Sequence, residues 1–351
     1  MTRHVASPDG IVLRPGESFA VGSLPHRDTH EAVGFALAAT GIPTVPSLPR
    51  RSPAEGMIAQ ALVGIEGVSL VHYGSISVDP DALDLAGDVT TDLSGDAYAG
   101  FAAFLDSVRG LETPPDTVKW QFVGPLTLAF ALARSGLVTE VAAPLAMQAV
   151  RCHVRALQAE VAAVLPRATQ IVVFDEPLLH DALVPGFRVP ADEVIDFVSG
   201  ALAAVEPGNI AGVHSCGETD WAALLATGAN IISVPVPSAS DEAEMDRLAH
   251  AAARISEHLE HGGRIAWGAV RTDGPIAVSA DRPWKNLASV MCALVRSGVD
   301  PHLVRRNSFV TSACGLGTHS VAVAERVMTH VRDISGRVAE QATASLLTLG
   351  S

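Results

Sequence analysis

Lysine is nearly missing from this chain of 351 residues: Lys119 and Lys285 are its lysines, and arginine supplies the rest of its 24 basic residues. Against these stand 38 acidic residues, so the formal net charge at pH 7 is −14. Nucleic acids and anionic membranes bind surfaces that are rich in cationic side chains. The composition therefore predicts a protein with no nucleic-acid partner and no membrane partner.

Long apolar runs are missing as well. The most apolar stretch, residues 122–133, is too short to span a bilayer and contains Gly124 and Pro125. The first ten residues hold no apolar core of a signal peptide. Cysteine is scarce, with four in the chain, and without a secretion signal such thiols are more often metal ligands or catalytic groups than disulfide partners. We therefore expect a cytoplasmic protein.

What the chain does contain is an alternation of strand-like apolar runs with helical patterns. Two helix starts carry capping boxes, Asp28 with Glu31 and Asp241 with Glu244. The alternation predicts an α/β fold, a (β/α)8 TIM barrel of one domain over residues 1–351, with about 50–115 as an insertion after the second strand. Two packed α/β domains are the alternative. The apolar runs begin near residues 18, 42, 118, 169, 209, 230, 264 and 307.

The clearest candidate site lies at the ends of two of these runs. His214 and Cys216 are two positions apart, so on a strand they project from the same face. Cys314 ends another run, and a barrel gathers the carboxyl ends of its strands at one mouth. Imidazole and thiolates suit zinc, and three protein ligands leave a fourth position for a substrate. We therefore predict a zinc site; a buried histidine with two packing thiols is the alternative.

Five motifs, in order, resemble the catalytic half of the cobalamin-independent methionine synthases, within the zinc methyltransferase and uroporphyrinogen-decarboxylase-like barrels. The resemblance implies transfer of a methyl group from 5-methyltetrahydrofolate, or its polyglutamate, to the thiol of homocysteine, giving methionine. It implies a small-molecule thiol and a methyl donor as partners and leaves the oligomeric state open. The motifs are Gly22-Ser-Leu-Pro25, Val123-Gly-Pro-Leu-Thr127, Phe174-Asp-Glu-Pro177, His214-Ser-Cys216 and Cys314-Gly-Leu-Gly317.

The same resemblance assigns roles to residues around the zinc. Asp175 would hold the ammonium group of an amino-acid substrate, Ser23 with the local backbone its carboxylate, and Glu176 would be a further substrate contact. For Asp175 and Glu176 the alternative is capping of the following helix, and for Ser23 a turn. The leaving nitrogen of the donor needs a proton, for which Asp273 is the candidate acid.

Two more candidates come from their positions in the chain. His26, just past the first strand-like run, is a candidate catalytic residue; a proton relay, a hydrogen-bond donor to the site and a loop histidine are all open for it. Trp120 is the candidate contact for the folate donor, although a tryptophan in a strand is more often a core residue. Cys152 and Cys292 fall in helical patterns, where we expect them to pack.

The chain also departs from the family. The glutamate zinc ligand that the family carries after His-x-Cys is absent from residues 233–236. No acid stands at residues 47–50, where the family has a glutamate that contacts the amino acid. Asp273 stands where the family has a histidine acid. Two rival functions therefore stay open: a thiol methyltransferase with a methyl-corrinoid donor, and a zinc-retaining relative without catalysis.

Overall fold

The computed structural model describes residues 13–71, 75–85, 87, 89–183 and 189–348. Within that part of the chain the main sheet has six parallel strands, arranged in chain order. Runs such as Ile171–Phe174 are apolar and buried throughout, as strands of a covered parallel sheet are. The strands are β3 (Thr117–Val123), β4 (Thr169–Asp175), β5 (Ile210–His214), β6 (Ile231–Pro235), β7 (Arg264–Val270) and β8 (Ser308–Ser312).

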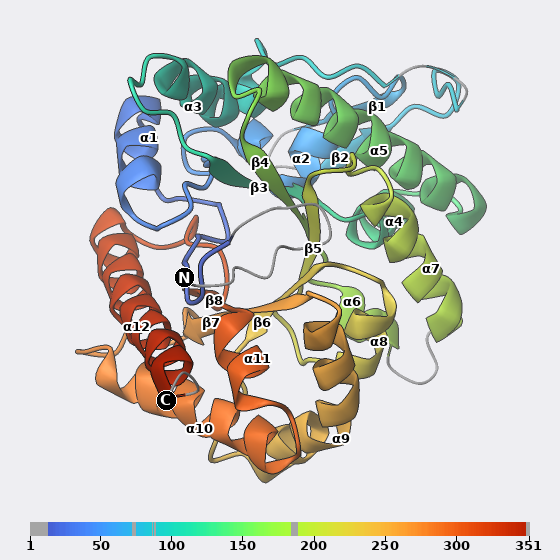
Figure 1. Ribbon diagram of the computed structural model, residues 1–351. Coiled ribbons are helices and arrows are strands. Elements are labelled where there is room, and N and C mark those ends of the chain that lie inside the picture. Colours follow the sequence, from blue (N-terminus) through green and yellow to red (C-terminus); the bar gives the residue numbers. More distant parts are fainter. Residues whose placement is uncertain (1–12, 72–74, 86, 88, 184–188, 349–351) are drawn as a thin grey trace.

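Helices surround this sheet (Figure 1), and the starts predicted from Asp28 and Asp241 are confirmed, because both carboxylates accept N–H groups of the first helical turn. Among the described residues, no helix combines the length and apolar content that crossing a bilayer requires. The helices are α1 (Thr29–Ala38), α2 (Met57–Ala61), α3 (Ala99–Arg109), α4 (Pro125–Arg134), α5 (Thr139–Val164), α6 (Leu179–Leu183), α7 (Ala191–Leu202), α8 (Trp221–Ala226), α9 (Glu242–Glu260), α10 (Asp281–Arg296), α11 (Pro301–Arg306) and α12 (Val321–Thr348), with 3-10 turns η1 (Pro53–Glu55) and η3 (Asp96–Tyr98).

The predicted closed barrel of eight strands is wrong, although the α/β class holds. Residues 18–24 and 42–48, expected as the first two strands, form no named strand in the described chain, and β3 and β8 are the two ends of an open sheet. Pro43 and Pro46 lack the N–H that a strand ladder needs, and Gly22 has a φ of 140°. The two segments instead make isolated parallel bridges, Ser18 with Val310, Ser23 with Ser47 and Thr44 with Lys119.

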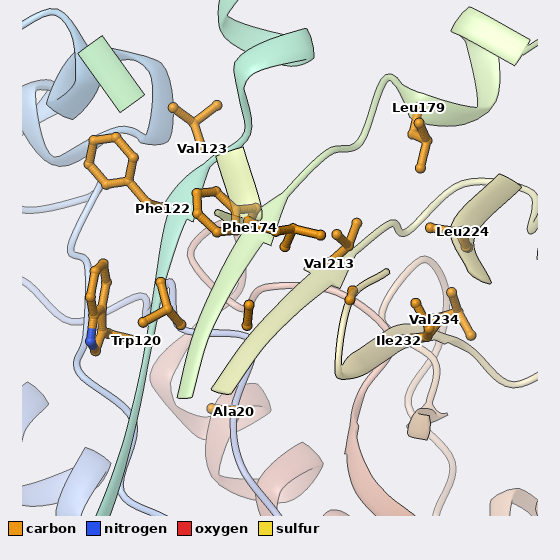
Figure 2. Packing of buried hydrophobic residues seen from close by; sticks show 14 of the residues in the cluster. Ala20, Trp120, Phe122, Val123, Phe174, Leu179, Val213, Leu224, Ile232 and Val234 are labelled. Carbon is orange, nitrogen blue, oxygen red and sulfur yellow. The ribbon is translucent and has the colours of Figure 1, made fainter. Parts of the chain in front are cut away.

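Two apolar clusters pack on the two faces of the sheet. In β4, Val172 and Phe174 belong to the larger cluster, part of which Figure 2 shows, whereas Ile171 and Val173 belong to a smaller one on the opposite face. Because side chains alternate along a strand, Asp175 continues the face of the smaller cluster. The end of this second face is therefore where polar side chains of the strands meet. The smaller cluster comprises Leu13, Phe19, Ile42, Ile171, Val173, Ile210, Ile231, Ala266 and Phe309.

A buried histidine connects the segment between residues 50 and 115, which was expected to be an insertion, to α5. This segment contains the antiparallel pair β1 (Val68–Leu70) and β2 (Ile76–Val78). His153 of α5 is fully buried, and its Nδ1 lies 2.8 Å from Thr91 Oγ1 and 3.3 Å from the Tyr98 hydroxyl. Burial lowers the pKa of His153 to about 4.

This histidine predicts a pH dependence of stability. Between pH 7 and pH 5 the wild-type protein is expected to lose about 2 kcal/mol more than a His153→Gln variant. The pKa of the ring is about 4 in the folded protein against 6.5 ordinarily, so the unfolded chain binds more protons in this range. The contribution of neutral His153 to the free energy of unfolding is fully present above about pH 6.5, and it is lost as the pH falls from 6.5 to about 4. Urea unfolding at both pH values measures it; equal losses in the two proteins would contradict it.

Candidate metal centre

Three side chains from two distant parts of the chain meet at the carboxyl end of the sheet. His214 is the last residue of β5, Cys216 follows it by two positions, and Cys314 follows β8 by two positions. One ligand atom from each lies within 4.8 Å of the others. His214 is buried and both thiols are half-buried. The structure thus brings together the three residues that the sequence proposed as zinc ligands.

The orientation of His214 fits a metal ligand. Its Nδ1 lies 3.0 Å from the hydroxyl of Ser233, its parallel partner in β6, whereas its Nε2 is buried and has no hydrogen-bond partner in the described chain. Buried polar atoms are nearly always paired, so an unpaired Nε2 needs a ligand to satisfy it. A metal-binding histidine ordinarily donates its other ring N–H to a neighbouring acceptor, here the Ser233 oxygen.

The two thiols interact directly. A hydrogen bond from Cys216 lowers the pKa of Cys314, with a smaller contribution from His214, and the same hydrogen bond raises the pKa of Cys216. The contact therefore favours the thiolate form of Cys314. Thiolate is the form that binds metal, and one imidazole with two soft sulfurs is a donor set suited to zinc. The residues present fit the ion.

Replacing Ser233 is expected to weaken metal binding without touching a ligand. Ser233→Ala removes the acceptor for Nδ1–H and should lower zinc affinity about 10- to 100-fold, whereas Ser233→Thr keeps a hydroxyl and should stay close to wild type. Competition with a chromogenic zinc chelator measures both affinities. If Ser233→Ala binds zinc as tightly as the wild type, the hydroxyl does not orient His214.

A cavity of about 280 Å³ adjoins this cluster. Asp175, at the end of β4, lines it together with His214, to which it is paired in the register of β4 and β5. The Oδ1 atom of Asp175 is buried and, within the described chain, without a hydrogen-bond partner. Burial raises the pKa of Asp175 to about 6, while His214 and Lys119 act in the opposite direction. A cationic group of a ligand in the cavity would satisfy this carboxylate.

Lys119 supplies the buried positive charge next to Asp175. It is 1% exposed, and its ammonium group donates to the backbone oxygen of Val21 and, at 3.1 Å, to Oε1 of Gln121, which lines the cavity. Burial lowers the pKa of Lys119 to about 8. These bonds join β3 to the segment that contains Ser23.

Ser23 lines the cavity and fastens the loop that contains Cys314. Its Oγ accepts the N–H of Gly317 at 3.3 Å, and its backbone oxygen accepts the N–H of Leu316 at 2.9 Å. A Cβ at Gly315 would lie 2.1 Å from Ser23 Oγ, so a side chain at this position would displace the Ser23 hydroxyl. Ser23 Oγ can still donate its own hydrogen to a ligand. The turn role and the substrate-contact role predicted for Ser23 are therefore compatible.

Glu176 points to a helix start rather than to the cavity. Its carboxylate is fully buried and accepts the N–H groups of Leu126 and Thr127 at 2.9 and 2.8 Å and the Thr127 hydroxyl at 2.6 Å. A Cβ at Gly124 would lie 2.1 Å from its Oε1. The alternative predicted for Glu176, capping of the following helix, is wrong: the carboxylate lies at the start of α4, earlier in the chain. Burial raises the pKa of Glu176 to about 7.

Three other predicted residues lie outside the residues that line the cavity. Trp120 is 1% exposed and belongs to the larger cluster (Figure 2). Its Nε1 donates to Gln170 Oε1. His26 is buried with its ring 5.1 Å from that of Phe35, and burial lowers its pKa. Asp273 is exposed and paired with Arg271, which lowers its pKa and favours the ionised form. The function proposed below assigns none of them a role.

Sequence reasoning missed two residues at the site. Ser233 was noted for the glutamate it replaces, but the pairing of β5 with β6 was the signal that would place its hydroxyl beside His214. Glu55 is a buried carboxylate that lines the cavity; it accepts the N–H groups of Leu48 and Gly100 and pairs with Arg51. The spacing of Arg51 and Glu55 by four positions was the available signal.

Comparisons with known proteins support the fold. No family model matches the chain, and no curated protein matches it. The structure is similar to that of a "putative vitamin-B12 independent methionine synthase" from Listeria monocytogenes, with a TM-score of 0.55 and 12% sequence identity. The similarity covers 94% of this chain and 99% of the other. At this identity the likeness shows a shared fold and leaves activity and ligands to be argued from the site.

Proposed function

We propose that this chain is a zinc-dependent methyltransferase that moves a methyl group from 5-methyltetrahydrofolate to the thiol of homocysteine. The observation that carries the proposal is the cluster of His214, Cys216 and Cys314 on the wall of a cavity that Asp175 also lines. The Oδ1 atom of Asp175 has no hydrogen-bond partner among the described residues. The name of the Listeria protein agrees with this chemistry, and the likeness to it in fold supports the choice of reaction to test first.

Each part of the cavity has a task in this reaction. Zinc, when bound by His214, Cys216 and Cys314, supplies the positive charge that keeps a substrate thiol deprotonated at neutral pH. Asp175 binds the ammonium group of the acceptor, and the hydroxyl of Ser23 donates a hydrogen bond to the carboxylate of the acceptor. Apolar side chains on the same wall, among them Phe122 and Val123, exclude water from the acceptor sulfur.

The overall reaction balances without a redox partner. The acceptor sulfur gives an electron pair to the methyl carbon, so that an S–C bond forms while the C–N bond of the folate breaks. The electron pair of that bond stays on the folate nitrogen, which then takes a proton. The acceptor has lost its thiol proton, so the net proton count is unchanged.

The test is a methylation assay with zinc-loaded protein, homocysteine and 5-methyltetrahydrofolate, with methionine detected by mass spectrometry. Methionine that depends on both substrates supports the proposal. Methionine formed with a methyl-corrinoid and not with the folate would replace the donor. Zinc binding with no methionine from either donor would overturn the catalytic assignment and favour a binding relative.

A further inference from the structure

A second hollow reaches Cys216 from the side of β6 and β7. It has a volume of about 500 Å³, and apart from Cys216 its walls come from residues that do not line the 280 Å³ cavity. The residues that matter for its chemistry lie after β5, on α9 and after β7. We call this hollow the polar groove; it is lined by Cys216, Glu218, Asp241, Glu244, Arg247 and Arg271, among others.

Two carboxylates of the polar groove already accept hydrogen bonds from backbone N–H groups. Asp241 accepts the N–H groups of Ala243 and Glu244 as the N-cap of α9, and the Glu244 carboxylate accepts the N–H of Ser238. These carboxylates hold the groove wall in place. Ligand recognition therefore falls to the two guanidinium groups.

Each guanidinium group is paired with one partly exposed acid. Arg247 pairs with Glu218 at 2.9 Å, and Arg271 pairs with Asp273; the acidic side chains of these pairs are 49% and 63% exposed. Exposed ion pairs contribute little to stability, so a carboxylate of a ligand can take the place of either acid at small cost. Arginine binds carboxylates with two parallel hydrogen bonds, which fixes the orientation of the ligand.

On the β6 side the wall of the groove is formed by residues without charged side chains. Pro235, Val236 and Pro237 line it where the family resemblance implied a glutamate ligand. These three side chains contain no carboxylate that could reach toward Cys216. A bound ligand can therefore extend from the two arginines to the metal cluster along this wall.

We propose that the polar groove binds the methyl donor, with carboxylates of the donor on Arg247 and Arg271, while the thiol acceptor occupies the cavity beside Asp175. This inference rests on the proposed function and adds the place of the donor. Donor and acceptor then approach the cluster along different walls and meet at Cys216, which lines both hollows. A donor with more carboxylates has more partners for the two arginines.

The test measures binding of 5-methyltetrahydrofolate and its triglutamate to zinc-loaded protein by titration calorimetry, without a thiol. Arg247→Met and Arg271→Met are each expected to weaken triglutamate binding about tenfold or more. Arg254→Met is the matched control, because Arg254 lies on the same helix and lines a neighbouring pocket but not the groove. Zinc content should equal that of the wild type in all three variants.

The outcomes separate the two proposals. If the wild type binds the folate and both groove variants bind it equally well, the donor lies elsewhere and the groove assignment is overturned, while the proposed function stands. If the wild type binds neither folate yet methylates homocysteine from a corrinoid, the folate part of the proposed function fails and the groove assignment fails with it. Equal weakening by Arg254→Met would show a general charge effect and would also overturn it.

Discussion

Replacing Cys314 with serine is expected to abolish zinc binding and methyl transfer together. The zinc content should fall from about one ion per chain to less than about a tenth, because a serine hydroxyl stays protonated where the thiolate of Cys314 supplies a ligand. Cys216→Ser should behave in the same way. Metal analysis after dialysis against a chelator gives the zinc content, and the homocysteine assay gives the activity.

The other two cysteines are matched controls for these variants. Cys152 lies on α5 and Cys292 on α10, away from the cluster, and their serine variants should keep both zinc and activity. Circular dichroism checks that each variant is folded. Full zinc content in both Cys216→Ser and Cys314→Ser would show that the cluster is not the metal site.

Asp175→Asn is expected to raise the KM for homocysteine about 100-fold while leaving the zinc content unchanged. The carboxylate is buried and its Oδ1 has no partner in the described chain, so the ammonium group of the acceptor is what it is placed to bind. Loss of a buried charge-assisted contact of this kind costs about 2–3 kcal/mol. Steady-state kinetics over a range of homocysteine concentrations measure the effect.

An acceptor without an amino group isolates this contact. With 4-mercaptobutyrate in place of homocysteine, the wild type and Asp175→Asn should show nearly equal KM values, because there is no ammonium group for Asp175 to bind. A wild-type KM for homocysteine in Asp175→Asn would contradict the role. A large loss with both acceptors would instead indicate a disturbance of the cavity itself.

The meeting of His214, Cys216 and Cys314 could be predicted because part of its signal is local. His214 and Cys216 are separated by two positions at the end of an apolar run, and strand geometry alone places them on one face. The meeting with Cys314 depended on parallel strands in chain order, which the main sheet has. β5 and β8 are three strands apart in the sheet, so their ends can meet within 4.8 Å only because the sheet curves. The prediction needed this curvature and did not need the sheet to close.

Two features could not be predicted from the sequence: that the sheet stays open, and which groups individual polar side chains contact. The runs at 18–24 and 42–48 are as apolar as the true strands, but prolines and the backbone of Gly22 limit them to isolated bridges. Asp175 and Glu176 are neighbours of the same type, yet one lines the cavity and the other caps α4. Strand alternation gives them opposite faces, but which helix start meets Glu176 follows from packing.

Because the sheet is open, β8, which Cys314 follows, is one of its two edge strands. Ser23 accepts a hydrogen bond from the loop that contains Cys314. Ser23 also forms a bridge with residues 42–48, the segment that bridges to β3. An ion bound by His214, Cys216 and Cys314 would act as a cross-link between the loop after the edge strand β8 and the inner strand β5. Local unfolding of β8 and of the loop that follows it would then be coupled to metal release, because it removes the ligand Cys314. If zinc binds as proposed, amide protons of β8 and of residues 18–24 are therefore expected to exchange more slowly in the zinc-loaded protein than in the metal-free protein.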